Sequence, residues 1–375
     1  MQVDEAGWRW PFLCGNCGRV YEAHGFPYCC PACGGLYELQ LPLAVESPNA
    51  TRGKRRGLER HRSMLPLPPD APLVSLGEGG TPLLACDLDG RDVYFKCEHL
   101  NPTGSFKDRG TAIIVSALMA EGMHEAVEDS SGNAGASFAA YCSRAGIRAR
   151  IYVPKYASGT KRAQIEWAGA EIVSVPGPRS AASIAARKHA ESGVAYASHA
   201  HLPHVQAGMA TMAVELVEQL GCSPGAVVTP VGQGTLLLGV YYGFQSLITA
   251  GLIDVMPQMV GVQAQACAPI WIEHVFGPEG RDSMSEDETV ATGIRIANPL
   301  RKDAVLDAVR LSGGRILAVD ESKIQTGRNA LAAIGFYVEP TSSVVWPAVH
   351  QIILDLPDPI VVVLTGSGFK DMRFI

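Results

Sequence analysis

The sequence predicts an α/β protein in which helices cover mostly parallel sheets, preceded by a small cysteine-rich module. From about residue 92, short apolar runs alternate with runs of helical character. That alternation is typical of βαβ units, whose strands pair in parallel. Two C-x-x-C pairs lie within the first 40 residues. A chain of 375 residues is long enough for two lobes plus such an appendage.

The expected strands are short apolar runs bounded by polar or turn-forming residues, and they cover 93–96, 126–128, 150–153, 171–175, 194–197, 227–230, 259–263, 316–319 and 360–364. The expected helices lie among them, at 111–121, 135–145, 161–167, 181–191, 206–220, 235–247 and 324–333. In such folds, ligands bind at the carboxyl ends of strands, beside the N-termini of helices. Glycine-rich loops that follow strands are therefore the first candidates for a functional site.

The composition excludes several classes of partner. With 47% hydrophobic and 18% charged residues, the chain resembles an ordinary soluble protein. Its net charge of −6 gives no global footprint for nucleic-acid binding. No run approaches the ~20 apolar residues of a membrane helix, and residues 1–11 lack the pattern of a secretory signal. A cytoplasmic protein without a membrane or nucleic-acid partner is expected.

The cysteines point to a local metal site. Five of the ten lie in residues 14–33, where Cys14 pairs with Cys17 and Cys30 with Cys33. Two such pairs complete a tetrahedral shell of four thiolates, which suits a structural Zn²⁺ ion and leaves no open position for catalysis. Residues 1–40 are therefore expected to form a zinc-ribbon-like module in a reducing compartment. The alternative is a ribbon without metal, held by packing alone.

Residues 41–75 are expected to form a linker with little regular structure. Six prolines punctuate this segment, and a basic run lies at 52–56. A basic run can contact nucleic acid, but no aromatic residues interleave with this one. A solvated, mobile tether is therefore favoured, followed by a catalytic domain over 76–375.

Lys107 is the strongest candidate for chemistry. It follows a loop at 101–106 that contains Pro and Gly, between an expected strand and an expected helix. A lysine amine becomes a nucleophile when burial or nearby dipoles lower its pKa, and its standard use is a Schiff base with a carbonyl cofactor. The alternative is a helix start that carries an exposed lysine.

Three further loops follow expected strands. The loop 130–135 contains Asn133, whose amide can donate to a phenolate oxygen. The loop 232–235, Gly-Gln-Gly-Thr, allows backbone N–H groups and a helix dipole to meet one phosphate. Thr365 follows the last strand, where its hydroxyl is a neutral partner for a ring nitrogen. Each loop taken alone is also compatible with an ordinary turn and helix cap.

Taken together and in order, these stretches resemble the fold-type II family of pyridoxal-phosphate (PLP) enzymes, most closely the threonine synthases. The resemblance covers roughly residues 75–371 and is carried by the stretches at 78–83, 100–110, 131–133, 291–299, 339–340 and 364–371. It implies two lobes, each with a mostly parallel sheet covered by helices. The smaller lobe would span about 111–205, and the larger lobe would be built from the remainder.

The resemblance also implies a role for each site residue. Lys107 would carry the cofactor covalently, and Asn133 would face its 3′ oxygen. The phosphate would be held by Gly232, Gln233, Gly234 and Thr235. Thr365 would face the ring nitrogen, while Ser130 and Ser131 would bind the substrate's carboxylate or phosphate. An incoming amine would displace Lys107, which would then remove the Cα proton. In threonine synthases, the γ-phosphate of O-phosphohomoserine then leaves and water adds at Cβ.

Two features depart from the threonine synthase pattern. Val205 occupies the place where the substrate-phosphate arginine is expected, and valine cannot replace that clamp. The loop at 232–235 is closer to the loops of serine and threonine dehydratases. His199, His201 and His204 crowd the same region as Val205, and histidine can serve as an acid, a base or a phosphate contact. His199 is taken as a substrate-binding candidate; a polar loop with chance histidines is the alternative.

Lys96, at the end of its strand, is a further substrate-binding candidate, because it could face a substrate anion; the alternative is a solvated lysine. The leading hypothesis for function is a threonine synthase-like lyase that eliminates and replaces at the β and γ carbons of an amino acid. The second is an ammonia-lyase or β-replacement enzyme acting on another amino acid. The third is a non-catalytic regulatory binding protein. Among relatives a homodimer is common.

Overall fold

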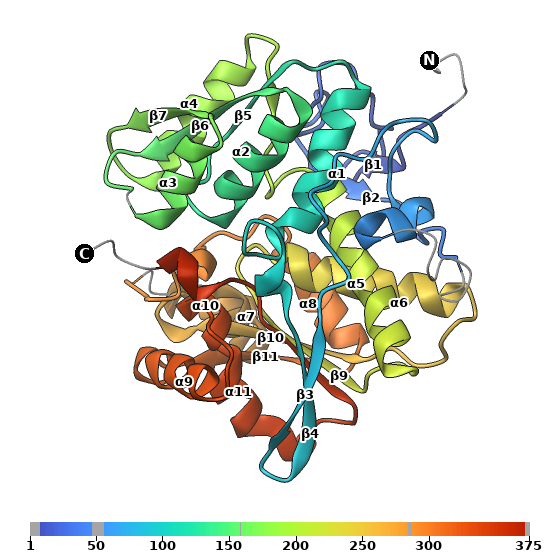
Figure 1. Cartoon of the computed structure of the whole chain (residues 1–375), viewed down its shortest axis with the longest axis vertical. Coiled ribbons are helices and arrows are strands. Elements are labelled where there is room, and N and C mark those ends of the chain that lie inside the picture. Colours follow the sequence, from blue (N-terminus) through green and yellow to red (C-terminus); the bar gives the residue numbers. More distant parts are fainter. Residues whose placement is uncertain (1–7, 47–55, 158, 284–286, 372–375) are drawn as a thin grey trace.

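The computed structural model describes residues 8–46, 56–157, 159–283 and 287–371. Two separate sheets are flanked by helices, and a two-stranded ribbon lies near the N-terminus (Figure 1). The strands are β1 Phe12–Cys14, β2 Tyr37–Leu39, β3 Leu83–Leu88, β4 Arg91–Lys96, β5 Glu125–Glu128, β6 Arg148–Pro154, β7 Glu171–Val175, β8 Ala195–Tyr196, β9 Ala226–Pro230, β10 Gln258–Ala264, β11 Arg315–Val319 and β12 Ile360–Val363. The α-helices are α1 Lys107–Ala120, α2 Asn133–Ala145, α3 Thr160–Trp167, α4 Arg179–Ala190, α5 His204–Leu220, α6 Thr235–Thr249, α7 Pro269–Phe276, α8 Lys302–Leu311, α9 Glu321–Ala333, α10 Pro340–Ser343 and α11 Val345–Ile352. The predicted α/β architecture is confirmed.

The larger sheet has the strand order β11-β10-β9-β12-β4-β3. All of its neighbouring strands are parallel except β3 and β4. The last strand of the chain, β12, lies between β9 and β4, and its apolar residues are fully buried, as expected for a central parallel strand. This order brings the loops that follow β4, β9 and β12 to one edge of the sheet.

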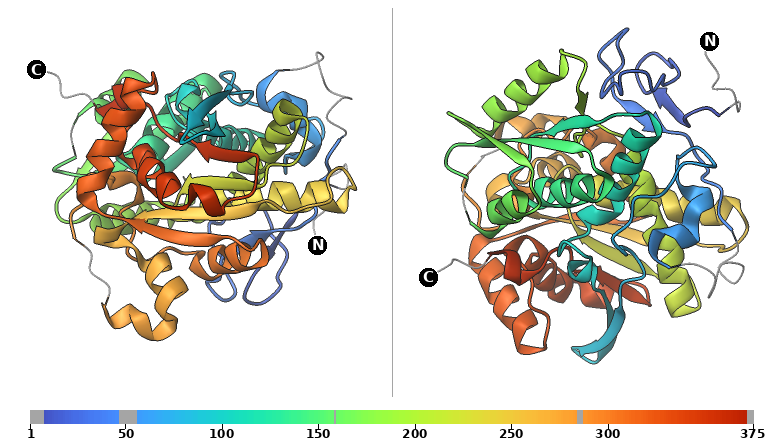
Figure 2. Two further views of the ribbon diagram at one scale, coloured as in Figure 1. Left: turned by 90° about the horizontal axis from the view of Figure 1, so that it is seen from below. Right: turned by 45° about the horizontal axis from the view of Figure 1, so that its top comes forward.

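The smaller sheet has the order β7-β6-β5-β8, and all its strands are parallel. Helices α2, α3 and α4 pack with it, as Figures 1 and 2 show in green. The strand β5 is an interior strand of this sheet, and the loop that follows it carries residues 129–132 to the N-terminus of α2.

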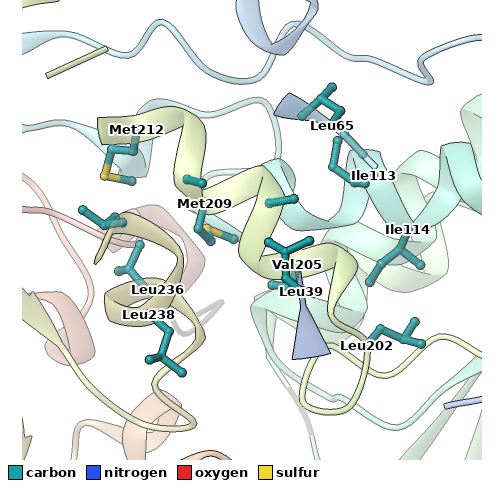
Figure 3. Packing of buried hydrophobic residues seen from close by; sticks show 14 of the residues in the cluster. Leu39, Leu65, Ile113, Ile114, Leu202, Val205, Met209, Met212, Leu236 and Leu238 are labelled. Carbon is teal, nitrogen blue, oxygen red and sulfur yellow. The ribbon is translucent and has the colours of Figure 1, made fainter. Parts of the chain in front are cut away.

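Helix α5 forms the centre of the core, because 204–217 are all buried. Figure 3 shows its apolar side chains between α1 and α6, with Leu39 of the ribbon and Leu65 beside them. Glycine permits these helices to approach closely. A Cβ on Gly208 would lie 2.3 Å from the Arg109 carbonyl oxygen, and one on Gly239 would lie 2.3 Å from Met209 Cβ.

The expected linker at 41–75 is not a solvated tether over its described part. A short 3₁₀-helix spans Gly57–Met64 and contacts α5, with Leu58 and Met64 buried. Arg60 pairs with Glu218 at 2.7 Å. These apolar residues and this ion pair fix the segment to the core, although its prolines suggested otherwise. Most of the basic run at 52–56 lies outside the described residues.

Helix α1 begins at Lys107 rather than 111, and α2 begins at Asn133 rather than 135. The strand β3 and the helices α7, α8, α10 and α11 were not predicted. The signal for β3 is Asp89-Gly90, where both residues have positive φ (54° and 79°), as the tight turn of a β-hairpin requires. Among the described helices, none combines the length and the apolar character that crossing a bilayer requires.

Candidate active site

The loop that carries Lys107 is tied to the loop that carries Thr365. Phe106 N–H donates to the Thr365 carbonyl at 3.0 Å, and Ser367 N–H donates to the Gly104 carbonyl at 2.9 Å. Because β4 and β12 are neighbours in parallel, both loops leave the same edge of the sheet. The structure therefore brings the predicted lysine and the predicted hydroxyl to one place.

Lys107 is half-buried, and the protein around its amine removes much of the water that would solvate a charge. Burial lowers the pKa of Lys107 to about 8, although the carboxylates of Glu128 and Glu339 oppose this shift. Its Nζ lies 4.6 Å from the centre of the Phe106 ring. A lysine whose pKa is near 8 keeps a useful fraction of neutral, nucleophilic amine at physiological pH.

Several buried polar atoms on the loops around this lysine have no hydrogen-bond partner among the described residues, including Ser105 Oγ and His199 Nδ1, and two of them belong to predicted cofactor contacts. These two are Asn133 Oδ1 and Thr365 Oγ1. Asn133 holds its other side-chain atom in place by donating from Nδ2 to Glu339 Oε1 at 2.8 Å. An unpaired buried polar atom costs about 1–3 kcal/mol, so such atoms are typical of a site that a ligand completes. The Thr365 hydroxyl can donate to a ring nitrogen, and the second N–H of Asn133 Nδ2 remains for a phenolate oxygen, so the two side chains predicted to face the cofactor ring fit PLP.

The loop after β9 has the form of an anion cradle. Gly234 has φ +82°, which favours glycine, and it caps the 15-residue helix α6, whose first residue, Thr235, is buried. A Cβ on Gly232 would lie 3.1 Å from Ile294 Cα. The side chain of Gln233 is already engaged, because its Oε1 accepts from Leu300 N–H at 3.0 Å. A phosphate would thus meet backbone N–H groups, the helix dipole and a hydroxyl.

The loop after β5 contains the two candidate serines. Ser130 is buried, its N–H donates to Glu128 Oε2, and its hydroxyl accepts from Gly132 N–H at 3.1 Å. Ser131 is half-buried. The hydroxyl of Ser130 therefore stabilises the loop. The structure shows no comparable hydrogen bond for the hydroxyl of Ser131.

The three histidines have separate environments. His199 is buried beside α1, and its Nε2 lies 2.9 Å from Thr111 Oγ1, one helical turn from Lys107. Burial and the Lys107 charge lower the pKa of His199 to about 3. His199 is therefore neutral at physiological pH, whereas the sequence predicted a histidine that could gain or lose a proton near neutral pH. His201 Nδ1 lies 3.0 Å from Ser198 Oγ, and His204 packs among aromatic rings of the N-terminal ribbon.

Lys96 is a correction to the sequence interpretation. Its side chain is fully buried, and its Nζ lies 2.6 Å from Glu215 Oε2 and donates to the Thr81 carbonyl at 2.9 Å. The partner carboxylate comes from α5, far along the chain. Because the ammonium is paired inside the protein, it does not face a substrate anion.

Two carboxylates that act on the Lys107 amine, those of Glu128 and Glu339, were not predicted from the sequence to have a role in the site. Glu128 is the last residue of β5, and burial together with Asp129 raises its pKa to about 8. His199 Nδ1 lies 3.8 Å from its Oε1. Glu339 also pairs with Lys161 of α3 at 2.9 Å, which links the two sheets' layers. Two acids at 128–129, directly before a Ser-Ser-Gly-Asn loop, were the available signal for Glu128.

Covalent incorporation of PLP into the apoprotein should accelerate as the pH rises toward about 8, the pKa of Lys107, and level off above it. Only the neutral amine attacks a carbonyl, and its fraction falls about tenfold per pH unit below the pKa. Glu128→Gln should move the midpoint only slightly to lower pH, because the Glu128 carboxyl, with a pKa of about 8, is only partly charged at that pH. Stopped-flow absorbance of the bound cofactor measures this rate. A midpoint at the ordinary lysine value would contradict the prediction.

The four predicted metal ligands come together in the ribbon. The Sγ atoms of Cys14, Cys17, Cys30 and Cys33 all lie within 4.8 Å of one another. Cys14 ends β1, and the strand pairing places it opposite Tyr37 of β2. Four thiols in this spacing fit a tetrahedral metal ion of the zinc type. Cys29, beside the second pair, is half-buried and is not part of the cluster.

Comparison with known proteins agrees with this geometry. The family model described as "Pyridoxal-phosphate dependent enzyme" matches residues 74–366. The threonine synthase of Methanocaldococcus jannaschii is 34% identical over 335 residues, covering 85% of this chain and 82% of that protein. The threonine synthase of Mycobacterium bovis is 34% identical over 338 residues, covering 86% and 91%.

Solved structures share the fold. The T.th. threonine deaminase superposes with a TM-score of 0.66 at 27% identity and covers 79% of this chain and 94% of that one. Maize serine racemase superposes with a TM-score of 0.67 at 20% identity, covering 77% and 88%, which shows the fold alone.

Proposed function

The chain belongs to the pyridoxal-phosphate-dependent enzymes, and we propose that it catalyses a threonine synthase-like elimination and replacement at the β and γ carbons of an amino acid such as O-phosphohomoserine. The observation that carries the proposal is the desolvated Lys107 amine on a loop that is hydrogen-bonded to the loop of Thr365, whose buried Oγ1 has no partner among the described residues. The threonine synthases at 34% identity support the choice of reaction.

When bound, PLP supplies an electron sink for negative charge that develops at the substrate Cα. In this proposal Lys107 Nζ holds the cofactor and, once the substrate amine has displaced it, accepts the Cα proton. A pKa near 8 suits this exchange, because both protonation states are accessible at neutral pH. The amine would then return the proton further along the substrate.

The other residues bind and orient. Asn133 faces the cofactor's 3′ oxygen in this proposal, while the neutral hydroxyl of Thr365 faces the ring nitrogen. The loop formed by Gly232, Gln233, Gly234 and Thr235 holds the phosphate. Ser130 and Ser131 receive the substrate carboxylate or phosphate, and His199, which is neutral, can contact the substrate only as an uncharged group.

A second candidate function, an ammonia-lyase acting on serine or threonine, is favoured by one observation. Val205, at the position expected for the phosphate-binding arginine, is fully buried, and a Cβ on Gly110 would lie 2.8 Å from its Cγ1. An apolar side chain packed in this way offers no charge to a substrate phosphate. The likeness to a threonine deaminase structure at 27% identity fits the same possibility.

Product analysis separates the two reactions. The purified holoenzyme is incubated with O-phosphohomoserine and assayed for phosphate and threonine, then with L-threonine or L-serine and assayed for 2-oxo acid and ammonia. Phosphate and threonine in equal amounts are expected. Oxo-acid formation without threonine formation would replace the first proposal with the second. No product from either set, with PLP bound, would favour a regulatory binding protein.

We also propose that the cysteine cluster holds one structural Zn²⁺ ion, that residues 1–40 form its module, and that 76–375 form the catalytic domain. Elemental analysis should find one zinc per chain. We also propose a homodimer and a cytoplasmic location, as the sequence predicts, and light scattering and cell fractionation can test them.

A further inference from the structure

One buried side chain, Arg301, joins the cysteine module to the loops around the cofactor site. Arg301 directly precedes α8 and is 4% exposed. Its Nε–H donates to Glu38 Oε2 at 3.2 Å, and an Nη2–H donates to the Tyr37 carbonyl at 2.9 Å. Both acceptors lie in β2, and Tyr37 pairs directly with Cys14 of the metal cluster. The guanidinium therefore contacts Tyr37 itself, the strand partner of a predicted metal ligand.

The same guanidinium holds the loop that follows β8. It donates to the carbonyls of Ala200 at 2.5 Å and His201 at 2.9 Å. These residues come directly after His199, whose ring contacts Thr111 on the helix that begins with Lys107. One side of the cofactor site is thus connected to Arg301 through the peptide chain and one side-chain contact.

The residue before Arg301 reaches the other side of the site. Leu300 N–H donates to Gln233 Oε1 in the phosphate loop at 3.0 Å. The module cannot easily rotate away from this junction, since His204 of α5 is packed between ribbon rings, 4.6 Å from Phe12 and 5.3 Å from Phe26 between ring centres. The ribbon is therefore packed firmly against the helices of the catalytic domain.

We propose that Arg301 is a positioning residue through which the metal-bound cysteine module sets the geometry of the 199–201 loop and of Gln233, and so the affinity for PLP. This inference rests on the proposed function and on the proposed metal in the cysteine cluster. A folded β2 presents the Tyr37 carbonyl and the Glu38 carboxylate in fixed positions. Because the guanidinium of Arg301 is planar and rigid, its bonds to β2 also fix where it binds the 200–201 carbonyls. A module without metal would lose the fixed positions and loosen both loops.

The test is a cycle between an Arg301 substitution and metal removal. Full-length wild type, Arg301→Gln and the control Arg310→Gln are titrated with PLP, with and without prior treatment by a chelator. Arg310 lies on the adjoining helix α8 with a 72% exposed side chain. Metal content and circular dichroism are recorded for every sample. Arg301→Gln should bind PLP about tenfold more weakly at full metal content, since small displacements of a site lower its function steeply.

The decisive result is whether the effects of metal removal and of Arg301→Gln on PLP affinity add. Metal removal should weaken PLP binding by a similar factor in wild type and in Arg310→Gln, but should have little further effect in Arg301→Gln, because the link is already cut. Should Arg301→Gln not fold, Glu38→Gln, at the half-exposed end of the same contact, carries the test with a smaller loss in the same direction.

Equal PLP affinity in Arg301→Gln and Arg310→Gln, or additive losses in the cycle, would overturn the inference. Failure of the proposed function is distinguishable, because a different reaction would appear in the product assay and leave the PLP titrations unchanged, whereas a protein that is not a PLP enzyme would show no PLP uptake even as wild type. A metal-free wild type that binds PLP normally would overturn the inference and leave the proposed function intact.

Discussion

Lys107→Ala is expected to abolish covalent attachment of PLP and to reduce turnover by at least about 10³-fold, in line with the loss of a positioned acid–base group and covalent anchor. The amine is the one group in the described site that can both hold the cofactor and move the Cα proton. Burial lowers its pKa to about 8, so its charged form is already disfavoured in the folded protein. The substitution should therefore leave the melting temperature nearly unchanged.

Absorbance of the bound cofactor, turnover and thermal unfolding measured side by side check this expectation. Lys188→Ala is the matched control, because Lys188 is an exposed lysine on α4 of the smaller sheet's layer. The control should keep both absorbance and turnover. A Lys107→Ala protein that turns over at the normal rate would show that the acid–base group lies elsewhere.

Arg109→Met is expected to lower the free energy of unfolding by about 3–5 kcal/mol, the cost of breaking a buried ion pair from one side. Arg109 makes two hydrogen bonds to Glu98, at 2.7 and 2.8 Å, and two to Glu215, at 2.8 and 2.7 Å. Lys96 completes the cluster, and all four side chains are at most 2% exposed. Removing the arginine leaves two carboxylates to share one lysine in a dry interior.

The lowered pKa of Glu98 supports a loss of stability on removing Arg109. Burial by itself would raise the pKa of Glu98, but the Arg109 guanidinium more than offsets it and holds that pKa below its usual value. Urea unfolding of Arg109→Met against Arg148→Met provides the measurement. Arg148 forms a surface pair with Glu125 at 3.3 Å and is 70% exposed, so its loss should cost less than about 1 kcal/mol. Equal midpoints for the two variants would contradict the assignment.

The features that local sequence reveals are those fixed by neighbouring residues. Apolar runs such as 360–363 are strands because a central parallel strand must be apolar on both faces. The loops with Asn133 and Gly234 were identifiable because a helix start after a strand needs particular small or polar residues. The cysteine pairs were identifiable because a C-x-x-C turn is itself the metal-binding unit.

The features that were missed depend on partners distant in the chain. Lys96 was assigned to the substrate because its partner, Glu215, lies 119 residues away. Arg301 contacts residues up to 264 positions away in the chain, and nothing in its local sequence marks it. Glu128 is marked in the sequence only by its place before the Ser-Ser-Gly-Asn loop; its raised pKa comes mainly from burial, which only the packed structure defines.

The most direct test of the central claim is to reduce the PLP-loaded protein with borohydride, digest it and locate the pyridoxyl label by peptide mass spectrometry. We expect one label per chain, on Lys107. A label on Lys96, Lys161 or Lys370, or no label in a protein that binds PLP, would contradict this expectation.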